Sequence, residues 1–373
     1  MPDIAKQSHS PITISLCMIV KNEEATIERC LRSVEQIVDE IIIVDTGSTD
    51  KTKELVRQFT NNIYDFEWID DFASARNYAF SKATQEYVLW LDADDVILDQ
   101  DCQKLLELKA TLSREIEVLT MLYYLSFDTA GNVLYQIRRE RLIKREKNYQ
   151  WIGAVHEFLA AKGIQLDTEI AVAHKPVKHD SDRNLKIYEK RQLKGEEFSP
   201  RDLYYYAKEL RDHNLYNRAI EYYQKFLATK QGALEDNIAA CASLADCFYE
   251  LHDADNELKY IFQSFQYSTP RSDFCCRLGF HHLNNNQIKQ AIFWYTLATH
   301  LKTANSSWGL VNNQCETWLP HLQLCVCYSR LGDYKLAYEH NEKAAKFIPD
   351  NPMIQHNRKL LQEKLGIELS EHE

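Results

Sequence analysis

The segment EYVLWLDADDV (residues 86–96) is the clearest indication of the architecture of the first half of the chain. An apolar run at 87–91 leads directly into Asp92, Asp94 and Asp95. A run this apolar is typical of a strand buried on both faces, as in a parallel sheet covered by helices. Ligands of open α/β sheets bind at the carboxyl ends of the strands. The stretch therefore predicts an α/β domain with acidic side chains at its ligand-binding edge.

The segments before this stretch repeat the order of strand and then helix. Apolar strands are expected at 12–20, 40–45 and 63–66, and amphipathic helices at 23–34, 51–61 and 72–84. Between residues 117 and 174 the pattern changes to longer strands, which suggests a mixed extension of the same sheet. The fold class expected for the N-terminal domain is therefore α/β, with a Rossmann-like mixed sheet.

Beyond residue 180 the strand pattern ends and paired helices follow. After a helix expected at 184–194, four segments align on one small-residue position, at Ala219, Glu257, Ala291 and Ala337. The first two intervals are close to the tetratricopeptide period of about 34 residues. The third is longer and needs an insertion at about 303–316. We expect an α/β catalytic domain at 1–180, a helical linker at 181–200 and an all-α, tetratricopeptide-like repeat domain at 201–373.

Composition and charge limit the function classes. The net charge of −11 argues against a nucleic-acid binder, since phosphate binding depends on excess Lys and Arg. No stretch approaches the roughly 20 apolar residues of a membrane span. The ten cysteines form no CxxC pair, and residues 1–10 lack a signal-peptide pattern. We therefore expect a reduced, cytoplasmic protein.

The acidic run after the apolar strand predicts a divalent-metal site. Asp92 and Asp94 flank the small Ala93, so both carboxylates can turn toward one hard cation such as Mg²⁺ or Mn²⁺. The alternative is a turn with helix-capping aspartates, because Asp is favoured in both roles. No G-x-G-x-x-G or Walker lysine motif follows a predicted strand, so dinucleotide or P-loop chemistry is disfavoured.

Four motifs in order resemble the family-2 glycosyltransferases of the GT-A fold. They lie at strand-to-helix junctions or strand ends, and the resemblance extends over about residues 12–174. Their sequences are SLCMIVKNEEATIERCLRSV (15–34), DEIIIVDTGSTDKT (39–52), DDFASARNYAF (70–80) and EYVLWLDADDV (86–96). The resemblance implies a UDP-sugar donor and a divalent cation, Mg²⁺ or Mn²⁺.

The resemblance also implies a role for individual residues. Asp45 would contact the uracil or ribose, and Asp92 the ribose or the metal shell. The nucleotide-sugar site implied in this way comprises Val20, Glu23, Asp45, Arg76, Asn77, Asp92, Ala93 and Trp151. The implied metal ligands are Asp94, Asp92 and His174.

Two later segments resemble a subset of this family that carries C-terminal tetratricopeptide repeats. WIGAVHE (151–157) is similar to its W-x-G-x-V-H-E segment, Arg141 lies in the matching basic strand, and IAVAH (170–174) resembles its I-x-x-x-H strand. The subset includes the sublancin-type peptide glycosyltransferases, which add a sugar to Cys, Ser or Thr of a bacteriocin precursor. The chain departs from the subset's His-x-Gly-Tyr continuation, since His174 is followed by Lys-Pro-Val.

The acceptor hydroxyl or thiol must lose a proton as it attacks the sugar, and a nearby carboxylate serves as general base. Glu157 is the expected base, with His156 as the alternative. Arg76 and the metal are expected to neutralise the leaving diphosphate. The competing structural interpretations are a salt-bridged surface pair for His156 and Glu157, and a core histidine for His174.

The expected function is an inverting transfer of a hexose or N-acetylhexosamine from a UDP-sugar to a Ser, Thr or Cys side chain. The acceptor would be a peptide or protein engaged by the repeat domain. That domain is alternatively a support for the catalytic domain or a homodimer surface. Two other functions stay open: transfer to a cell-surface or lipid-linked glycan, and a non-catalytic repeat scaffold.

Overall fold

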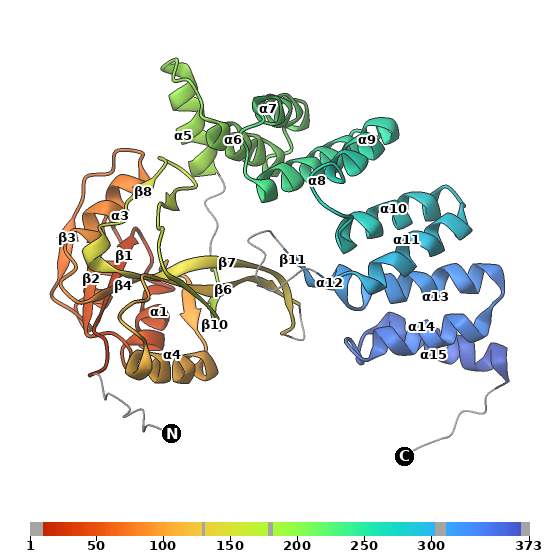
Figure 1. Ribbon diagram of the computed structural model, residues 1–373, viewed down its shortest axis with the longest axis horizontal. Helices are drawn as coiled ribbons and strands as arrows, with labels where there is room; N and C mark the ends of the chain where they lie inside the picture. Colours follow the sequence, from red (N-terminus) through yellow and green to blue (C-terminus); the bar gives the residue numbers. More distant parts are fainter. Residues whose placement is uncertain (1–9, 129–130, 178–181, 303–310, 367–373) are drawn as a thin grey trace, which may run out of the picture. The chain divides into compact units, whose positions relative to one another are not determined.

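The computed structural model describes residues 10–128, 131–177, 182–302 and 311–366 (Figure 1). The chain divides into two compact units, one ending at Phe198 and the other beginning at Ser199. The boundary expected between residues 180 and 181, and residues 1–9 at the start of the chain, lie outside the described ranges. Within those ranges, no helix has the length and apolar character needed to cross a bilayer.

The N-terminal unit is built on one mixed sheet, as expected. Along the sheet the strands follow the order β3-β2-β1-β4-β7-β6-β10-β5. β1 pairs in parallel with both β2 and β4, whereas β7 runs antiparallel to β4 and β6. The strand bounds are β1 Ile14–Val20, β2 Glu40–Asp45, β3 Ile63–Asp65, β4 Tyr87–Trp90, β5 Asp95–Ile97, β6 Val118–Phe127, β7 Val133–Lys144 and β10 Gln165–His174.

The central strands are buried on both faces, which explains their continuous apolar sequences. On β4, Leu89 belongs to one hydrophobic core and the next residue, Trp90, to the other, because successive side chains point to opposite faces. Helix α1 (Ile27–Val34) contributes to the first core and α3 (Phe72–Phe80) to the second. The two helices therefore cover opposite faces of the sheet.

The helices of this unit follow the expected order, but those expected at 23–34, 51–61 and 72–84 are each shorter than expected, with α1 beginning at Ile27 and α3 ending at Phe80. The helix expected at 51–61 is shorter and forms α2 (Thr52–Val56). Past Val56 the backbone tightens, since the amides of Gln58 and Phe59 donate three residues back. The remaining helices of the unit are α4 (Asp99–Thr111) and α5 (Asp182–Leu193).

The C-terminal unit consists of paired helices, and the repeat alignment made from sequence is confirmed. Ala219, Glu257, Ala291 and Ala337 are all buried, and each lies on the second helix of a pair. Within the expected insertion at 303–316, residues 303–310 lie outside the described ranges. The helices are α6 Pro200–Asp212, α7 Tyr216–Thr229, α8 Leu234–Glu250, α9 Ala254–Ser264, α10 Ser272–Asn284, α11 Ile288–His300, α12 Asn313–Glu316, α13 Leu319–Leu331, α14 Tyr334–Ala345 and α15 Pro352–Leu365.

Candidate functional site

A buried arginine links two acidic residues beyond the carboxyl end of β4. Arg76 is on α3, Asp92 follows β4, and Glu157 lies just before the short strand β9 (Phe158–Leu159). Arg76 Nε donates to Glu157 Oε1 at 2.5 Å, and Arg76 Nη2 donates to Asp92 Oδ1 at 2.7 Å. The Glu157 side chain is 11% exposed and that of Arg76 is 9% exposed, so Glu157 is not part of a surface salt bridge.

Two tryptophan rings enclose the Arg76 guanidinium. Its central carbon lies 5.1 Å from the Trp90 ring and 4.9 Å from the Trp151 ring, within the range of cation–π attraction. Burial opposes the charge of Arg76, but the adjacent Asp92 and Glu157 carboxylates outweigh it and raise the Arg76 pKa. Burial likewise acts to raise the Asp92 pKa, but Arg76 and Arg141 lower it overall. Arg76 and Asp92 therefore form a charged pair.

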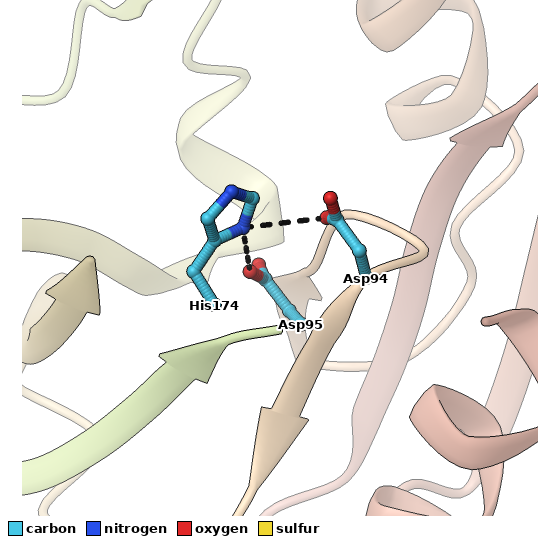
Figure 2. A group of neighbouring side chains, drawn as sticks. All are labelled: Asp94, Asp95 and His174. Atoms are coloured by element: carbon cyan, nitrogen blue, oxygen red, sulfur yellow. Dashed lines mark ion pairs between the residues drawn. The ribbon is translucent and has the colours of Figure 1, made fainter. Parts of the chain in front are cut away.

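A second cluster contains Asp94, Asp95 and His174, whose side chains converge (Figure 2). His174 Nδ1 lies 3.5 Å from Asp94 Oδ1 and 3.6 Å from Asp95 Oδ1. The sheet register creates this arrangement, because β5 pairs antiparallel with β10 and places Asp95 opposite His174. Residues far apart in the sequence thus meet at one edge of the sheet.

Asp95 is fully buried and its two carboxylate oxygens have different surroundings. Oδ2 lies 3.0 Å from Arg141 Nη1 and accepts a hydrogen bond from the Asp92 amide at 3.1 Å. Oδ1 has no hydrogen-bond partner among the described residues. A buried carboxylate oxygen without a partner is costly unless a cation or proton compensates it. This oxygen lies on the side of Asp95 that faces His174.

The protonation of His174 follows from the two carboxylates. Burial acts to lower its pKa, but hydrogen bonding and charge interactions with Asp94 and Asp95 outweigh burial and raise the pKa to about 10. The Tyr123 hydroxyl lies 2.9 Å from the same Nδ1 atom. The two carboxylates thus favour the protonated form of the His174 imidazole.

The donor atoms of this cluster fit a divalent metal ion. One atom from each of Asp94, Asp95 and His174 can be chosen so that all lie within 4.8 Å of one another. Two carboxylate oxygens and an imidazole nitrogen suit Mn²⁺, and the oxygens also suit Mg²⁺. The ligands implied from sequence were Asp94, Asp92 and His174. The structure brings Asp94 and His174 together with Asp95, while Asp92 is bonded to Arg76.

The residues expected to bind the nucleotide lie at the ends of β1 and β2. Val20 and Asp45 are register partners, so both strands end at the same edge. Asp45 Oδ1 accepts from the amides of Gly47 and Ser48, each at 2.9 Å, which shapes the loop after β2. Asp45 Oδ2 has no partner among the described residues. Burial raises the pKa of Glu23, and the Asp94 and Asp92 charges add to this, so Glu23 lies close to the acidic edge.

The other predicted site residues contribute mainly to packing or backbone contacts. Ala93 is buried in the hydrophobic core. Asn77 hydrogen-bonds the backbone of Trp151, donating from Nδ2 to its carbonyl at 3.0 Å and accepting from its amide at 2.8 Å. His156 has a φ of 51°, in the left-handed region that is uncommon for residues other than glycine. It thus adjoins Glu157 in a sharply turned segment.

Sequence reasoning did not assign functional roles to Asp95, Arg141 or Tyr123. Arg141 lies between two rings, 3.9 Å from that of Trp90 and 4.4 Å from that of Tyr123. An arginine and a tyrosine within predicted strands were the available sequence signals. Their meeting with Asp95 depends on the β7-β6-β10-β5 order, which the sequence pattern does not specify.

The chain matches a protein-family model and several known proteins in sequence. Residues 15–162 match the model of glycosyl transferase family 2. The chain is 27% identical over 235 residues to the SPbeta prophage-derived glycosyltransferase SunS of Bacillus subtilis, covering 59% of this chain and 54% of SunS. It is 35% identical over 146 residues to a TPR repeat-containing protein of Synechococcus elongatus, covering 39% of this chain and 35% of the relative.

These matches cover about half or less of each relative's own length. Among solved structures, glucosyl-3-phosphoglycerate synthase from Mycobacterium tuberculosis with Mn²⁺ and UDP-glucose aligns with 51% of this chain and 81% of that chain. The identity is 16% and the TM-score 0.34. The family match shows that the N-terminal unit carries a family-2 glycosyltransferase domain.

Proposed function

We propose that this family-2 glycosyltransferase domain makes the protein a metal-dependent, inverting transferase of a hexose or N-acetylhexosamine. The donor is a UDP-sugar, and the acceptor is a Ser, Thr or Cys side chain of a peptide or protein. The main observation in favour is the geometry beyond β4, where hydrogen bonds connect Asp92 both to the Asp94–Asp95–His174 group and, through Arg76, to Glu157. Asp92 is adjacent to Asp95 through its amide and is joined to Glu157 through Arg76.

Glu157 is the proposed general base. It accepts the proton of the attacking hydroxyl or thiol as the acceptor atom bonds to the anomeric carbon and the bond to the UDP oxygen breaks. One displacement from the opposite face of the sugar inverts the anomeric centre. Arg76 binds Glu157 through a single oxygen in the described contacts, which leaves the carboxylate a second oxygen for the proton.

The cation site supports the departure of the nucleotide. A divalent ion held by Asp94, Asp95 and His174 would neutralise charge on the leaving diphosphate. Asp95 Oδ1 is buried, has no hydrogen-bond partner among the described residues and lies 3.6 Å from His174 Nδ1; this convergence of donor atoms supports cation binding here. Arg141 keeps Asp95 in place from the other side through its 3.0 Å contact with Oδ2.

The nucleotide is proposed to bind at the ends of β1 and β2. Asp45 Oδ2 is an acceptor without a partner in the described residues, which suits a uracil N–H or a ribose hydroxyl. Val20 is its register partner on β1, and Glu23 lies on the loop that follows. These residues lie at the same strand ends as Asp92, so base and diphosphate can extend along one edge.

The proposed acceptor is a peptide or protein, and two features support it. The C-terminal unit is an array of helix pairs, an architecture that presents extended binding surfaces. The WIGAVHE segment carries Glu157 and resembles repeat-bearing peptide glycosyltransferases. All ten cysteines are free, which fits a reducing compartment, and we propose the cytoplasm.

Peptide transfer tests this proposal. Purified full-length protein is incubated with UDP-glucose or UDP-N-acetylglucosamine, Mn²⁺ and peptides containing Ser, Thr or Cys, and peptide mass is measured. A mass increase of one hexose or N-acetylhexosamine, lost in Glu157→Gln, supports the proposal. Donor hydrolysis with transfer only to glycan acceptors contradicts the peptide assignment. Absence of any nucleotide binding by calorimetry favours a non-catalytic scaffold.

A further inference from the structure

The segment that carries Glu157 has little secondary structure of its own. Strands β8 (Trp151–Ile152) and β9 pair only with each other in the described sheets. A two-stranded hairpin of this size is marginal in water without outside support. The position of Glu157, which directly precedes β9, therefore depends on contacts from outside the hairpin.

Helix α3 supplies three such contacts along its length. The Phe72 amide donates to the Ala154 carbonyl at 2.9 Å. One turn later Arg76 donates to Glu157, and the next residue, Asn77, contacts the Trp151 backbone. The hairpin is thus held at its beginning, at its middle and at Glu157.

The Asn77 contact requires the amide group. The Trp151 N–H needs an acceptor and its carbonyl needs a donor, and Asn77 supplies both at 2.8 Å and 3.0 Å. An aspartate of the same size accepts from the N–H but brings a carboxylate oxygen against the carbonyl. The assignment of the amide oxygen and nitrogen follows from this complementarity.

The Trp151 ring links the backbone contact of Asn77 to Arg76 and, through Arg76, to Glu157. Its ring is 5% exposed and lies 4.8 Å from Trp90, in an edge-to-face arrangement. The same ring covers the Arg76 guanidinium that binds Glu157. A shift of the Trp151 backbone therefore displaces a wall of the Arg76 site as well as the start of the hairpin.

We propose that Asn77 is a positioning residue that fixes Trp151 and, through it, the place of Glu157. This inference rests on the proposed function, because it assigns Glu157 as the base. It differs from the nucleotide-ligand role that family resemblance implies for Asn77, since both polar groups of the amide are engaged by Trp151.

The decisive variant is Asn77→Asp, compared with Asn61→Asp, which makes the same change at an exposed site on this unit. For Asn77→Asp, turnover at saturating UDP-sugar should fall by about 10-fold or more, because small misplacements of a catalytic group are costly. The calorimetric Kd for UDP with Mn²⁺ should stay within about 2-fold of wild type, as expected when no nucleotide contact is lost. Asn61→Asp should match wild type in both measurements.

Hydrogen–deuterium exchange of residues 151–159 tests the contact between Asn77 and the Trp151 backbone, called the clamp below, independently of transferase activity. Faster exchange there in Asn77→Asp, but not in Asn61→Asp, supports the clamp even if wild type shows no transferase activity, so the two proposals fail separately. Unchanged exchange overturns the clamp, as does a 10-fold weaker UDP Kd with unchanged turnover. If Asn77→Asp does not fold, Asn77→Ser gives the same comparisons without a charge beside the carbonyl.

Discussion

Arg76 and Glu157 form a buried ion pair across 81 residues of sequence, with Nε 2.5 Å from Oε1. Arg76 also binds Asp92, so its charge is shared between two carboxylates of the protein. The expected contact of Arg76 with the leaving diphosphate stays a prediction. In the structure, Arg76 holds Glu157, the proposed base, and Asp92 in fixed positions.

Replacing Arg76 tests this positioning role. Arg76→Met leaves two acidic groups without their buried partner, so the free energy of unfolding should fall by about 3 kcal/mol. Turnover should fall by about 100-fold or more, because Glu157 loses its anchor. Urea unfolding and donor hydrolysis measure the two effects, with the exposed Arg57→Met as control. Equal stability of Arg76→Met and Arg57→Met would contradict a structural ion pair.

Glu157→Gln tests whether Glu157 accepts a proton, because the substitution keeps the size of the side chain and the packing around it. The glutamine oxygen can still accept from Arg76 Nε, but the side chain no longer takes a proton at neutral pH. We expect turnover to fall by about 10²- to 10⁴-fold, with the UDP affinity in Mn²⁺ unchanged within about 2-fold. Single-turnover kinetics and calorimetry provide the measurements. The exposed Glu115→Gln is the matched control, and full activity of Glu157→Gln would exclude Glu157 as the base.

Helix packing in the repeat unit is tight at Gly279 on α10. A Cβ atom added there would lie 2.7 Å from ring atoms of Tyr295, whose side chain is 1% exposed. Gly279→Ala should destabilise the unit by about 1–3 kcal/mol, because overpacking outweighs the helix propensity gained. Denaturant unfolding tests this, and Tyr295→Leu should reduce the cost in a double-mutant cycle. A more stable Gly279→Ala variant would contradict the packing described.

Acid should lower the free energy of unfolding of the C-terminal unit through His321 on α13 and His340 on α14. Their Nδ1 atoms lie 3.1 Å apart, and burial, followed by the charge of Lys343, lowers the pKa of each to about 4. The unfolded chain, with histidine pKa near 6.5, binds more protons between pH 6.5 and 4. Stability contributed by the neutral pair is therefore present above pH 6.5 and is lost as pH falls toward 4.

Both histidines are partly exposed, so solvent screening reduces the effect to about 1 kcal/mol between pH 7.5 and 5. Urea midpoints of the full chain at these pH values measure it. The double substitution His321→Gln with His340→Gln should flatten this part of the pH dependence. An unchanged slope in the double variant would assign the acid sensitivity to other groups.

The strands of the proposed nucleotide-binding edge were predictable because each is a continuous apolar run followed by polar residues. β1, β2 and β4 lie within a few residues of the expected ranges. The helix pairs were predictable from a buried small position that recurs on their second helices. The partners of Asp92 and Asp95 could not be predicted, because they depend on contacts between residues that are distant in the sequence. His174 meets Asp95 through strand register, and Arg76 meets Glu157 through the docking of the β8–β9 hairpin on α3.

Calorimetry of UDP binding with and without Mn²⁺, for wild type and Asp94→Asn, tests whether the Asp94–Asp95–His174 group binds the cation. If Asp94, Asp95 and His174 hold the cation that meets the diphosphate, Mn²⁺ should strengthen UDP binding to wild type by about 10-fold or more, equivalent to about 1.4 kcal/mol. Asp94→Asn should lose that gain while keeping its fold by circular dichroism. Equal UDP affinity with and without Mn²⁺ in wild type, unaffected by Asp94→Asn, would mean that these side chains hold no cation for the diphosphate.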